Sequence, residues 1–166
     1  MTKALMVIDV QKWGFTGDWQ VADSTALLER IQKRVDEARA NGEFIVHVQN
    51  DGAEGEADAP GGPFWPVMIE PEGDEWLVNK TTSNTFETNP DLAERLRAAG
   101  IDELEMVGCQ SEMCVRSTAL GARAEGFTVT LPVGLHGTYN EETFTGKPGK
   151  TAVEFIAEVQ AEIDPR

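Results

Sequence analysis

The chain has 166 residues, of which 40% are hydrophobic and 26% charged, and its formal net charge is −15 at pH 7. This length suits one domain with a proper core, and we expect a single domain over residues 1–166. The negative charge argues against nucleic acid or an anionic membrane as a partner, because their phosphates would repel the chain.

Cysteine content and hydropathy narrow the class further. The two cysteines, Cys109 and Cys114, are too few for a disulfide framework and lack the second pair that a zinc site needs. The segment MTKALMVIDV is too short and turns acidic too early for a signal peptide, and no apolar run approaches the roughly 18 residues of a membrane span. We therefore expect a reduced, cytoplasmic protein.

Short apolar runs alternate with segments of helical periodicity along the chain. Strands are predicted, in chain order, at residues 4–9, 44–48, 75–80, 104–108 and 127–132. Helices are predicted at residues 23–42, 89–100, 112–126 and 151–163. This alternation predicts an α/β protein with a parallel sheet and helices on both of its faces.

Residues at the helix ends support these boundaries. Asp23 or Ser24 can cap the first helix, and Asn89 can cap the second. Thr151 and Glu154 form a capping-box pattern at the start of the last helix.

Two long segments interrupt the alternation. Residues 49–74 are rich in glycine, proline and acidic side chains, and residues 134–150 are similar. A loop of that length inside a compact domain is usually functional or mobile. We expect these two loops to set the choice of substrate.

Candidate catalytic residues lie at the strand ends. In open parallel sheets, ligands bind beyond the carboxyl ends of the strands. The first predicted strand ends at Asp9, the third at Lys80, and the fourth leads through a turn to Cys114. If these strands are neighbours, an acid, a base and a thiol meet in one cleft.

The three groups have complementary chemistry. A thiol reacts as its thiolate, and the first turn of a helix, where Cys114 lies, favours negative charge. A nearby Lys80 ammonium would lower the pKa of the thiol further. Asp9 could accept the thiol proton and return it to a leaving group. Backbone N–H groups in the turn at residues 109–114 could hold a developing oxyanion.

Each of these residues also has a purely structural interpretation. A buried cysteine is usually a small hydrophobic residue, an aspartate after a strand often forms a turn, and a lysine there is usually solvated. Cys109 is predicted to be a packed core residue. His47, inside the second strand, is predicted to be a core or pocket histidine.

Several aromatic residues fall in or near the loops at the predicted mouth and could form an apolar wall for a substrate. Alternatively, some of them cover the core or a subunit interface. The aromatic candidates are Trp13, Phe15, Phe64, Trp65, Phe86 and Tyr139. His136, beyond the fifth strand, is a further candidate for the pocket.

Three motifs, ALMVIDVQ, KTTSNTFET and GCQSEMCV, resemble in order and spacing the isochorismatase-like cysteine hydrolase family. This family includes nicotinamidases, carbamoyl-amide hydrolases, streptothricin-hydrolase-like enzymes and isochorismatases. The resemblance implies a Rossmann-like three-layer α-β-α sandwich and a catalytic triad of Asp9, Lys80 and Cys114. It also implies a cis peptide bond between Cys109 and Gln110, an oxyanion hole made by the backbone N–H groups of Gln110 and Cys114, and Phe86 as a pocket residue.

The chain departs from the family pattern at three places. The Asp-x-His…His metal site of nicotinamidases is absent after the second strand, so no metal is expected. Cys114 argues against vinyl-ether hydrolysis, because isochorismatases proper lack this cysteine. Gly134 and Leu135 replace the usual Asp-Ala after the fifth strand, and no clear sixth strand follows. The sheet is therefore predicted to have five or six strands.

Together these features predict a cysteine hydrolase that cleaves an amide-like C–N bond of a small molecule through a thioester and needs no cofactor. The resemblance also implies a homo-oligomer, a dimer or larger. The alternative is a catalytically silent member of the family, in which Cys114 senses oxidants or the chain acts as a binding protein.

Overall fold

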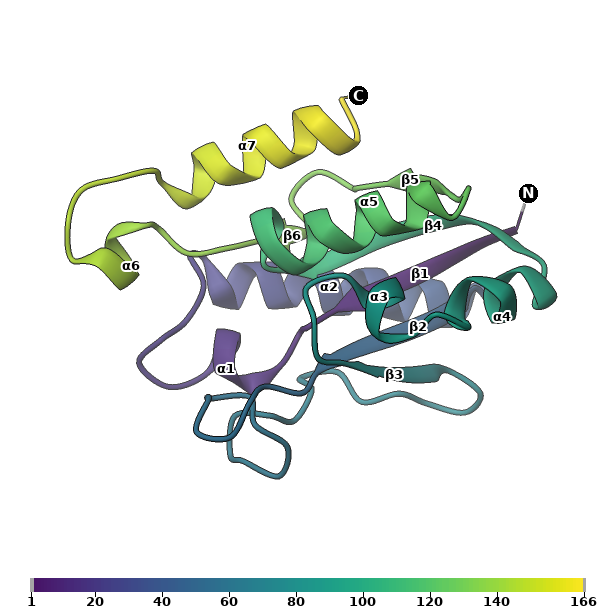
Figure 1. The fold of residues 1–166 in the computed structure, drawn as a ribbon, viewed down its shortest axis with the longest axis horizontal. Coiled ribbons are helices and arrows are strands. Elements are labelled where there is room, and N and C mark those ends of the chain that lie inside the picture. Colours follow the sequence, from purple (N-terminus) through teal and green to yellow (C-terminus); the bar gives the residue numbers. More distant parts are fainter. Residues whose placement is uncertain (1, 166) are drawn as a thin grey trace.

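The computed structural model describes residues 2–165, along which strands and helices alternate (Figure 1). The strands are β1 (Thr2–Ile8), β2 (Phe44–Asn50), β3 (Trp76–Lys80), β4 (Ile101–Cys109), β5 (Thr128–Thr130) and β6 (His136–Gly137). The helices are α1 (Lys12–Phe15), α2 (Ser24–Ala40), α3 (Thr85–Thr88), α4 (Leu92–Ala98), α5 (Arg116–Ala124), α6 (Glu142–Thr145) and α7 (Ala152–Ile163). A π-helical turn, η1 (Ser111–Val115), leads into α5.

The six strands form one parallel sheet in the order β3-β2-β1-β4-β5, with β6 also paired to β4. β4 is long enough to pair with two short strands in succession. Residues 103–105 pair with β5, whereas Gly108 and Cys109 pair with β6. The prediction of five or six strands is confirmed with six, and the sixth is only two residues long.

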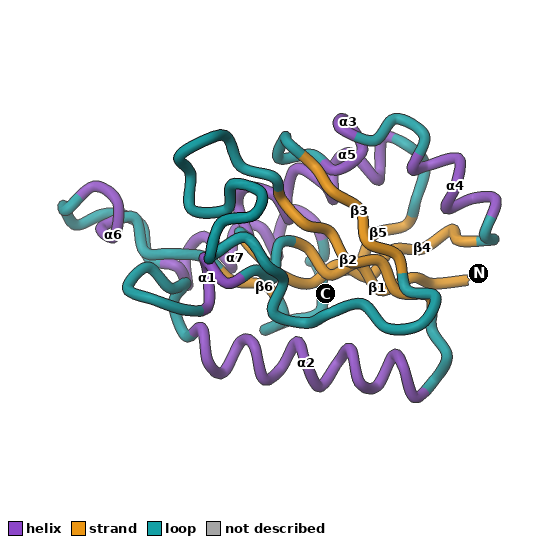
Figure 2. The backbone as a smooth tube through the Cα atoms, turned by 90° about the horizontal axis from the view of Figure 1, so that it is seen from below, coloured by secondary structure: helices purple, strands orange, loops and turns teal. Residues whose placement is uncertain are grey.

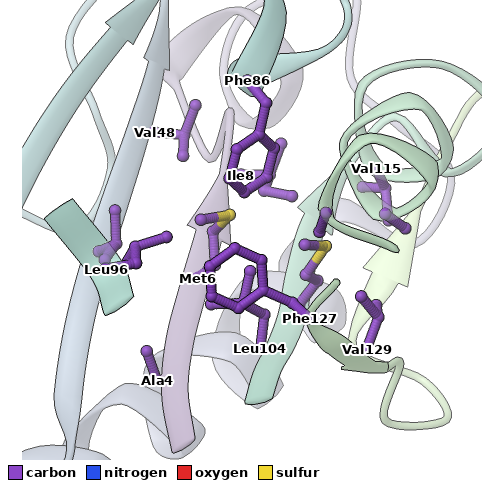
Figure 3. Packing of buried hydrophobic residues seen from close by; sticks show 14 of the residues in the cluster. Ala4, Met6, Ile8, Val48, Phe86, Leu96, Leu104, Val115, Phe127 and Val129 are labelled. Atoms are coloured by element: carbon purple, nitrogen blue, oxygen red, sulfur yellow. The ribbon is translucent and has the colours of Figure 1, made fainter. Parts of the chain in front are cut away.

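Side chains alternate across the sheet and fill two separate cores. Ala4, Met6 and Ile8 of β1 belong to the core under α3, α4, α5 and α7, part of which Figure 3 shows. Leu5 and Val7 belong to the core on the opposite face, which α2 covers. Figure 2 shows the sheet between α2 and the group of α3, α4 and α5. The predicted three-layer α-β-α architecture is therefore confirmed.

The strand and helix predictions hold in type, and most boundaries move by a few residues. The helix predicted from Asn89 begins at Leu92, and the Asn89 side chain donates to the backbone oxygens of Asn79 and Thr85, at 2.9 and 3.1 Å. The capping box of α7 is present as predicted. Among residues 2–165, no helix combines the length and apolar character needed to cross a membrane.

Two backbone features shape the carboxyl ends of β1 and β4. Gly108 has a φ of +123°, and a Cβ there would collide with the backbone of Ile8, so this close approach requires glycine. Asp9 has a φ of +51°, a left-handed conformation that Asp adopts more readily than most residues. The Asp9 N–H donates to the Val48 carbonyl of β2 at 3.0 Å. The chain therefore turns out of the sheet at Asp9 while it is held by the neighbouring strand.

Candidate active site

Three ionisable side chains meet at the carboxyl end of the sheet. The Lys80 ammonium lies 2.8 Å from Asp9 Oδ2 and 3.3 Å from Cys114 Sγ. Asp9 and Lys80 are 1% and 0% exposed, whereas Cys114 is half-buried. The structure thus brings together the carboxylate, the ammonium and the thiol that the strand-end argument placed at one edge.

The fold places each of these side chains at an element boundary. Asp9 follows β1, and Lys80 is the last residue of β3, with β2 between the two strands. Cys114 lies in η1, where the Val115 N–H donates to the Gln110 carbonyl at 3.1 Å. The predicted helix therefore begins with a π-helical turn, a rare feature that is often found at functional sites.

Asn50, the last residue of β2, completes the surroundings of Lys80 and was not identified from the sequence. Its Oδ1 accepts a hydrogen bond from Lys80 Nζ at 2.8 Å, and its Nδ2 donates to Asp58 Oδ2 at 2.7 Å. Gln11 holds the Asn50 backbone by accepting from its N–H and donating to its carbonyl. The predicted second strand stopped at Val48, and a strand longer by two residues would have marked Asn50 as a candidate.

Burial dominates the electrostatics of the three groups. It raises the pKa of Asp9 above its usual range, although the Lys80 ammonium opposes this effect. Burial also lowers the pKa of Lys80, but Asp9 and Cys114 outweigh it and leave that pKa raised. Burial and then the Asp9 charge raise the pKa of Cys114 to about 12. The free protein therefore holds a Cys114 thiol and a Lys80 ammonium at neutral pH, beside an Asp9 carboxyl group that is more basic than usual.

The two oxygens of Asp9 have different surroundings. Oδ2 contacts the Lys80 ammonium, whereas Oδ1 is buried and has no hydrogen-bond partner within residues 2–165. A buried carboxylate oxygen without a donor is costly unless something supplies a proton to it. Asp9 Oδ1 is therefore available to a hydrogen-bond donor that enters the site.

The turn between β4 and η1 has the backbone geometry that the resemblance implied. The peptide bond between Cys109 and Gln110 is cis. Gln110 and Cys114 both line the cavity at this edge of the sheet. Their backbone N–H groups remain the predicted oxyanion hole.

The cavity above the three groups has a volume of about 590 Å³. Four aromatic rings form one continuous part of its lining, the aromatic wall, which consists of Trp13, Trp19, Tyr139 and Phe144. Trp13 stacks on Tyr139 at 6.2 Å between ring centroids, and Phe144 packs edge-on against Tyr139 at 4.8 Å. The other lining residues are Asp9, Asn50, Glu56, Ala57, Asp58, Thr81, Thr82, Ser83, Gln110, Met113 and Cys114.

Of the seven candidates for the pocket, Trp13 and Tyr139 line this cavity, and Phe64 does not. Phe15 and Phe86 do not, because each is 7% exposed and packs in one of the two cores. The sequence analysis did not name Trp19, which lies between α1 and α2, or Phe144, which lies in α6. The available signal for both was an aromatic residue between the predicted strands and helices.

The last two predicted pocket residues hold the surrounding structure together and do not line the cavity. Trp65 Nε1 donates to Asp51 Oδ1 at 2.8 Å and so ties the long loop to the end of β2. His136, in β6, places Nδ1 2.9 Å from Ser111 Oγ and Nε2 3.1 Å from Gln160 Oε1. Burial lowers the pKa of His136, so it joins η1 to α7 as a neutral side chain.

No group of three or more His, Cys, Asp or Glu side chains within residues 2–165 is arranged to hold a metal ion. Cys109 is fully buried in the core under α2, and burial raises the pKa of its thiol. Cys114 is therefore the cysteine that a molecule in the cavity can reach.

Comparison with known proteins gives consistent matches over most of the chain. The Isochorismatase domain family matches residues 3–154. Streptothricin hydrolase from Streptomyces noursei is 36% identical over 99% of this chain, and ureidoacrylate amidohydrolase RutB from Variovorax paradoxus is 27% identical over 86%. An isochorismatase structure from Pseudomonas putida superposes with a TM-score of 0.86 at 26% identity, covering 98% of this chain and 84% of that one.

The relatives differ from this chain in length. The match covers 62% of the streptothricin hydrolase and 76% of the ureidoacrylate amidohydrolase. The chain thus matches the streptothricin hydrolase over nearly all of its own length but spans somewhat less than two thirds of that protein.

Proposed function

The chain belongs to the isochorismatase family, and from this premise we propose that it is an amidohydrolase that cleaves an amide-like C–N bond of a small molecule. The observation that carries the proposal is the contact of Lys80 with both Asp9 and Cys114, at 2.8 and 3.3 Å, beside a cavity of about 590 Å³, which is large enough for a small molecule. The name of one relative, ureidoacrylate amidohydrolase, denotes the same type of reaction.

The first half of the proposed reaction forms a thioester. Asp9 Oδ1, which has no partner among residues 2–165, accepts the proton of the Cys114 thiol. The Lys80 ammonium stabilises the thiolate, and the sulfur attacks the amide carbonyl carbon. The backbone N–H groups of Gln110 and Cys114 hold the oxyanion. Asp9 then gives its proton to the departing nitrogen as the C–N bond breaks.

The second half releases the acid. A water molecule takes the place of the amine, and Asp9 removes one of its protons as its oxygen attacks the thioester carbonyl. The C–S bond breaks, and the sulfur leaves as a thiolate that Lys80 stabilises until Asp9 returns the proton. One water is consumed for each C–N bond cleaved, and the mechanism needs no cofactor.

The alternative role of an oxidant-sensing thiol fits the electrostatics less well. Redox-sensing cysteines are usually accessible and have a low pKa in the free protein. Burial and the Asp9 charge raise the pKa of Cys114 to about 12. In the proposed reaction, Asp9 deprotonates Cys114 only once a carbonyl is bound. The free protein therefore does not need Cys114 as a thiolate.

The proposal is tested by trapping the thioester. Streptothricin and a panel of primary amides and carbamoyl amines are incubated with the protein, and products that have gained one water are detected by mass spectrometry. Acid quenching should preserve an acyl adduct on the peptide that contains Cys114. Cys114→Ala should lose the adduct and at least about 1000-fold of the turnover, as removal of a nucleophile does elsewhere.

Cys109→Ala is the matched control, because Cys109 is fully buried and does not line the cavity. This variant should keep the acyl adduct. Unchanged turnover by Cys114→Ala, or an adduct on another residue, would exclude the proposed covalent mechanism.

A further inference from the structure

Two carboxylates of the loop after β2 converge at the cavity, and we call this pair, Glu56 and Asp58, the acidic lip. Both residues line the cavity. A Cβ on Gly52 would collide with Asp58 Oδ1 and would lie 2.9 Å from Glu56 Oε2, so the two carboxylates point at the same small region above Gly52. The Ala53 N–H donates to Glu56 Oε2 at 2.8 Å and holds it there.

The charge of the acidic lip is not balanced nearby. Neither Glu56 nor Asp58 forms an ion pair with any residue from 2 to 165, and the polar partner of Asp58 is the neutral Asn50 side chain. No lysine, arginine or histidine of this part of the chain lines the cavity. Lys80, the cation of the candidate active site, uses its ammonium group on Asp9, Asn50 and Cys114.

Two further features of the same cavity favour positive charge. The aromatic wall presents four rings, and the faces of aromatic rings attract ammonium and guanidinium groups. Asp9, which is 1% exposed, also lines the cavity; its Oδ2 is paired with the Lys80 ammonium, whereas its Oδ1 has no hydrogen-bond partner among the described residues. Clefts lined by charge of one sign concentrate ligands of the opposite sign.

We propose that the cavity selects amides whose non-reacting part carries a positive charge, an ammonium or guanidinium group held between the acidic lip and the aromatic wall. The identification of the ligand as an amide rests on the proposed function, whereas the selection for positive charge does not. Anionic molecules of the same size are disfavoured by the two carboxylates of the acidic lip, which have no cation among the lining residues.

Charged thiol reagents test the selection without a need for turnover. A trimethylammonium-ethyl and a sulfonato-ethyl methanethiosulfonate each form a mixed disulfide when a thiolate displaces methanesulfinate. Their rate constants are measured on Cys114 and divided by those for 2-mercaptoethanol. We expect the normalised ratio of cationic to anionic reagent to be at least about tenfold at low salt and to fall towards one in about 1 M NaCl. Cys114→Ala gives the background rate.

Two variants that change the net charge equally show which part of the molecule causes the selection. Glu56→Gln should reduce the reagent ratio roughly threefold to tenfold, because it removes one charge beside the cavity while it keeps an acceptor for Ala53. Glu54→Gln is the matched control, since Glu54 is exposed in the same loop and does not line the cavity. It should leave the ratio within about twofold of the native value. Equal effects of both variants would assign the selection to the net charge of the molecule and overturn the subsite.

A matched set of amides connects the subsite to catalysis. 6-Aminohexanamide, hexanamide and adipamic acid have similar lengths and differ in the charge of the far end. We expect kcat/KM to be highest for 6-aminohexanamide, intermediate for hexanamide and lowest for adipamic acid. Glu56→Gln should mainly raise KM for the cationic amide. A native reagent ratio near one together with equal kcat/KM for all three amides would overturn the subsite and leave the hydrolase intact. A high ratio without hydrolysis of any amide would instead reject the proposed function while supporting the subsite.

Discussion

Asp9 and Lys80 form an ion pair from which water is excluded, since their side chains are 1% and 0% exposed. Burying two charges is expensive, and their attraction offsets the cost only when further hydrogen bonds satisfy the ions. Lys80 meets this condition through Asn50 and Cys114. The pair therefore meets the condition under which a buried ion pair is tolerated, and its contribution to stability can be measured.

The pair predicts a non-additive response to mutation. Lys80→Met should lower the free energy of unfolding by about 3–5 kcal/mol, because it leaves the Asp9 carboxylate buried without its counter-ion. The double variant Asp9→Asn/Lys80→Met should be more stable than Lys80→Met, since asparagine tolerates the left-handed conformation of residue 9 and carries no charge. Urea unfolding of the native chain, both single variants and the double variant measures the coupling.

Lys33→Met provides the control for this cycle. The Lys33 ammonium is 3.9 Å from Glu37 on the exposed face of α2, and exposed pairs of this kind contribute little. Its unfolding midpoint should match that of the native chain. Strict additivity of the Asp9 and Lys80 substitutions would mean that the two charges do not interact across the site.

At the scale of elements, contacts between segments far apart in the sequence hold the cavity wall in place. The Asn84 side chain accepts from the Phe86 N–H at 3.1 Å and caps α3, directly after the cavity residues Thr81, Thr82 and Ser83. The space that Asn84 occupies exists because residue 121, in α5, is glycine. A helix-interior glycine thus supports a loop that begins about 40 residues earlier.

Gly121→Ala should therefore destabilise the protein, although alanine has the higher helix propensity by about 1 kcal/mol. The new Cβ would collide with the Asn84 amide and displace the cap of α3, and we expect a net loss of about 1–3 kcal/mol in urea unfolding. Gly14→Ala, in α1, is the matched control, because its Cβ would meet only Val21 Cγ1 at an ordinary 3.6 Å. A more stable Gly121→Ala protein would show that Asn84 moves without cost.

At the scale of the whole molecule, two polar clusters lie at opposite ends of the sheet. The carboxyl end holds the candidate active site, and the opposite end holds a cluster around Glu75. Arg39 donates to both Glu75 oxygens at 2.7 and 3.0 Å, and His47 Nε2 lies 2.8 Å from Oε2. Burial raises the pKa of Glu75, but the hydrogen bonds from Arg39, the Glu72 N–H and His47 outweigh it and lower the pKa to about 2.

This cluster predicts a specific loss of stability in acid. Because the pKa of Glu75 is lower in the folded than in the unfolded chain, its stabilisation is present above about pH 4.5 and disappears as the pH falls towards 2. The shift corresponds to about 3 kcal/mol. Glu75→Gln should flatten the dependence of the unfolding free energy on pH in this window, as measured by urea unfolding at several pH values.

Glu29→Gln, on the exposed face of α2, is the control and should keep the slope of the native chain. An unchanged slope in Glu75→Gln would mean that other carboxylates account for the sensitivity to acid.

The sequence by itself determined the alternation of the longer strands and helices, the parallel sheet and the meeting of Asp9, Lys80 and Cys114 at one edge. Apolar runs and strand ends are local features, and the parallel topology alone brings those ends to one edge. The same argument identifies Asn50 once the second strand extends to residue 50, whereas the predicted strand ended at Val48.

The lining of the cavity was decided by the tertiary structure. Trp65 was predicted in the pocket, but its hydrogen bond to Asp51 turns it into an anchor for the loop that presents Glu56 and Asp58. Phe86 lies in the core, next to the Asn84 side chain that caps α3 and packs against Gly121 of α5. The path of a long loop depends on contacts between residues distant in the sequence, and no local pattern encodes which of its side chains turn inward.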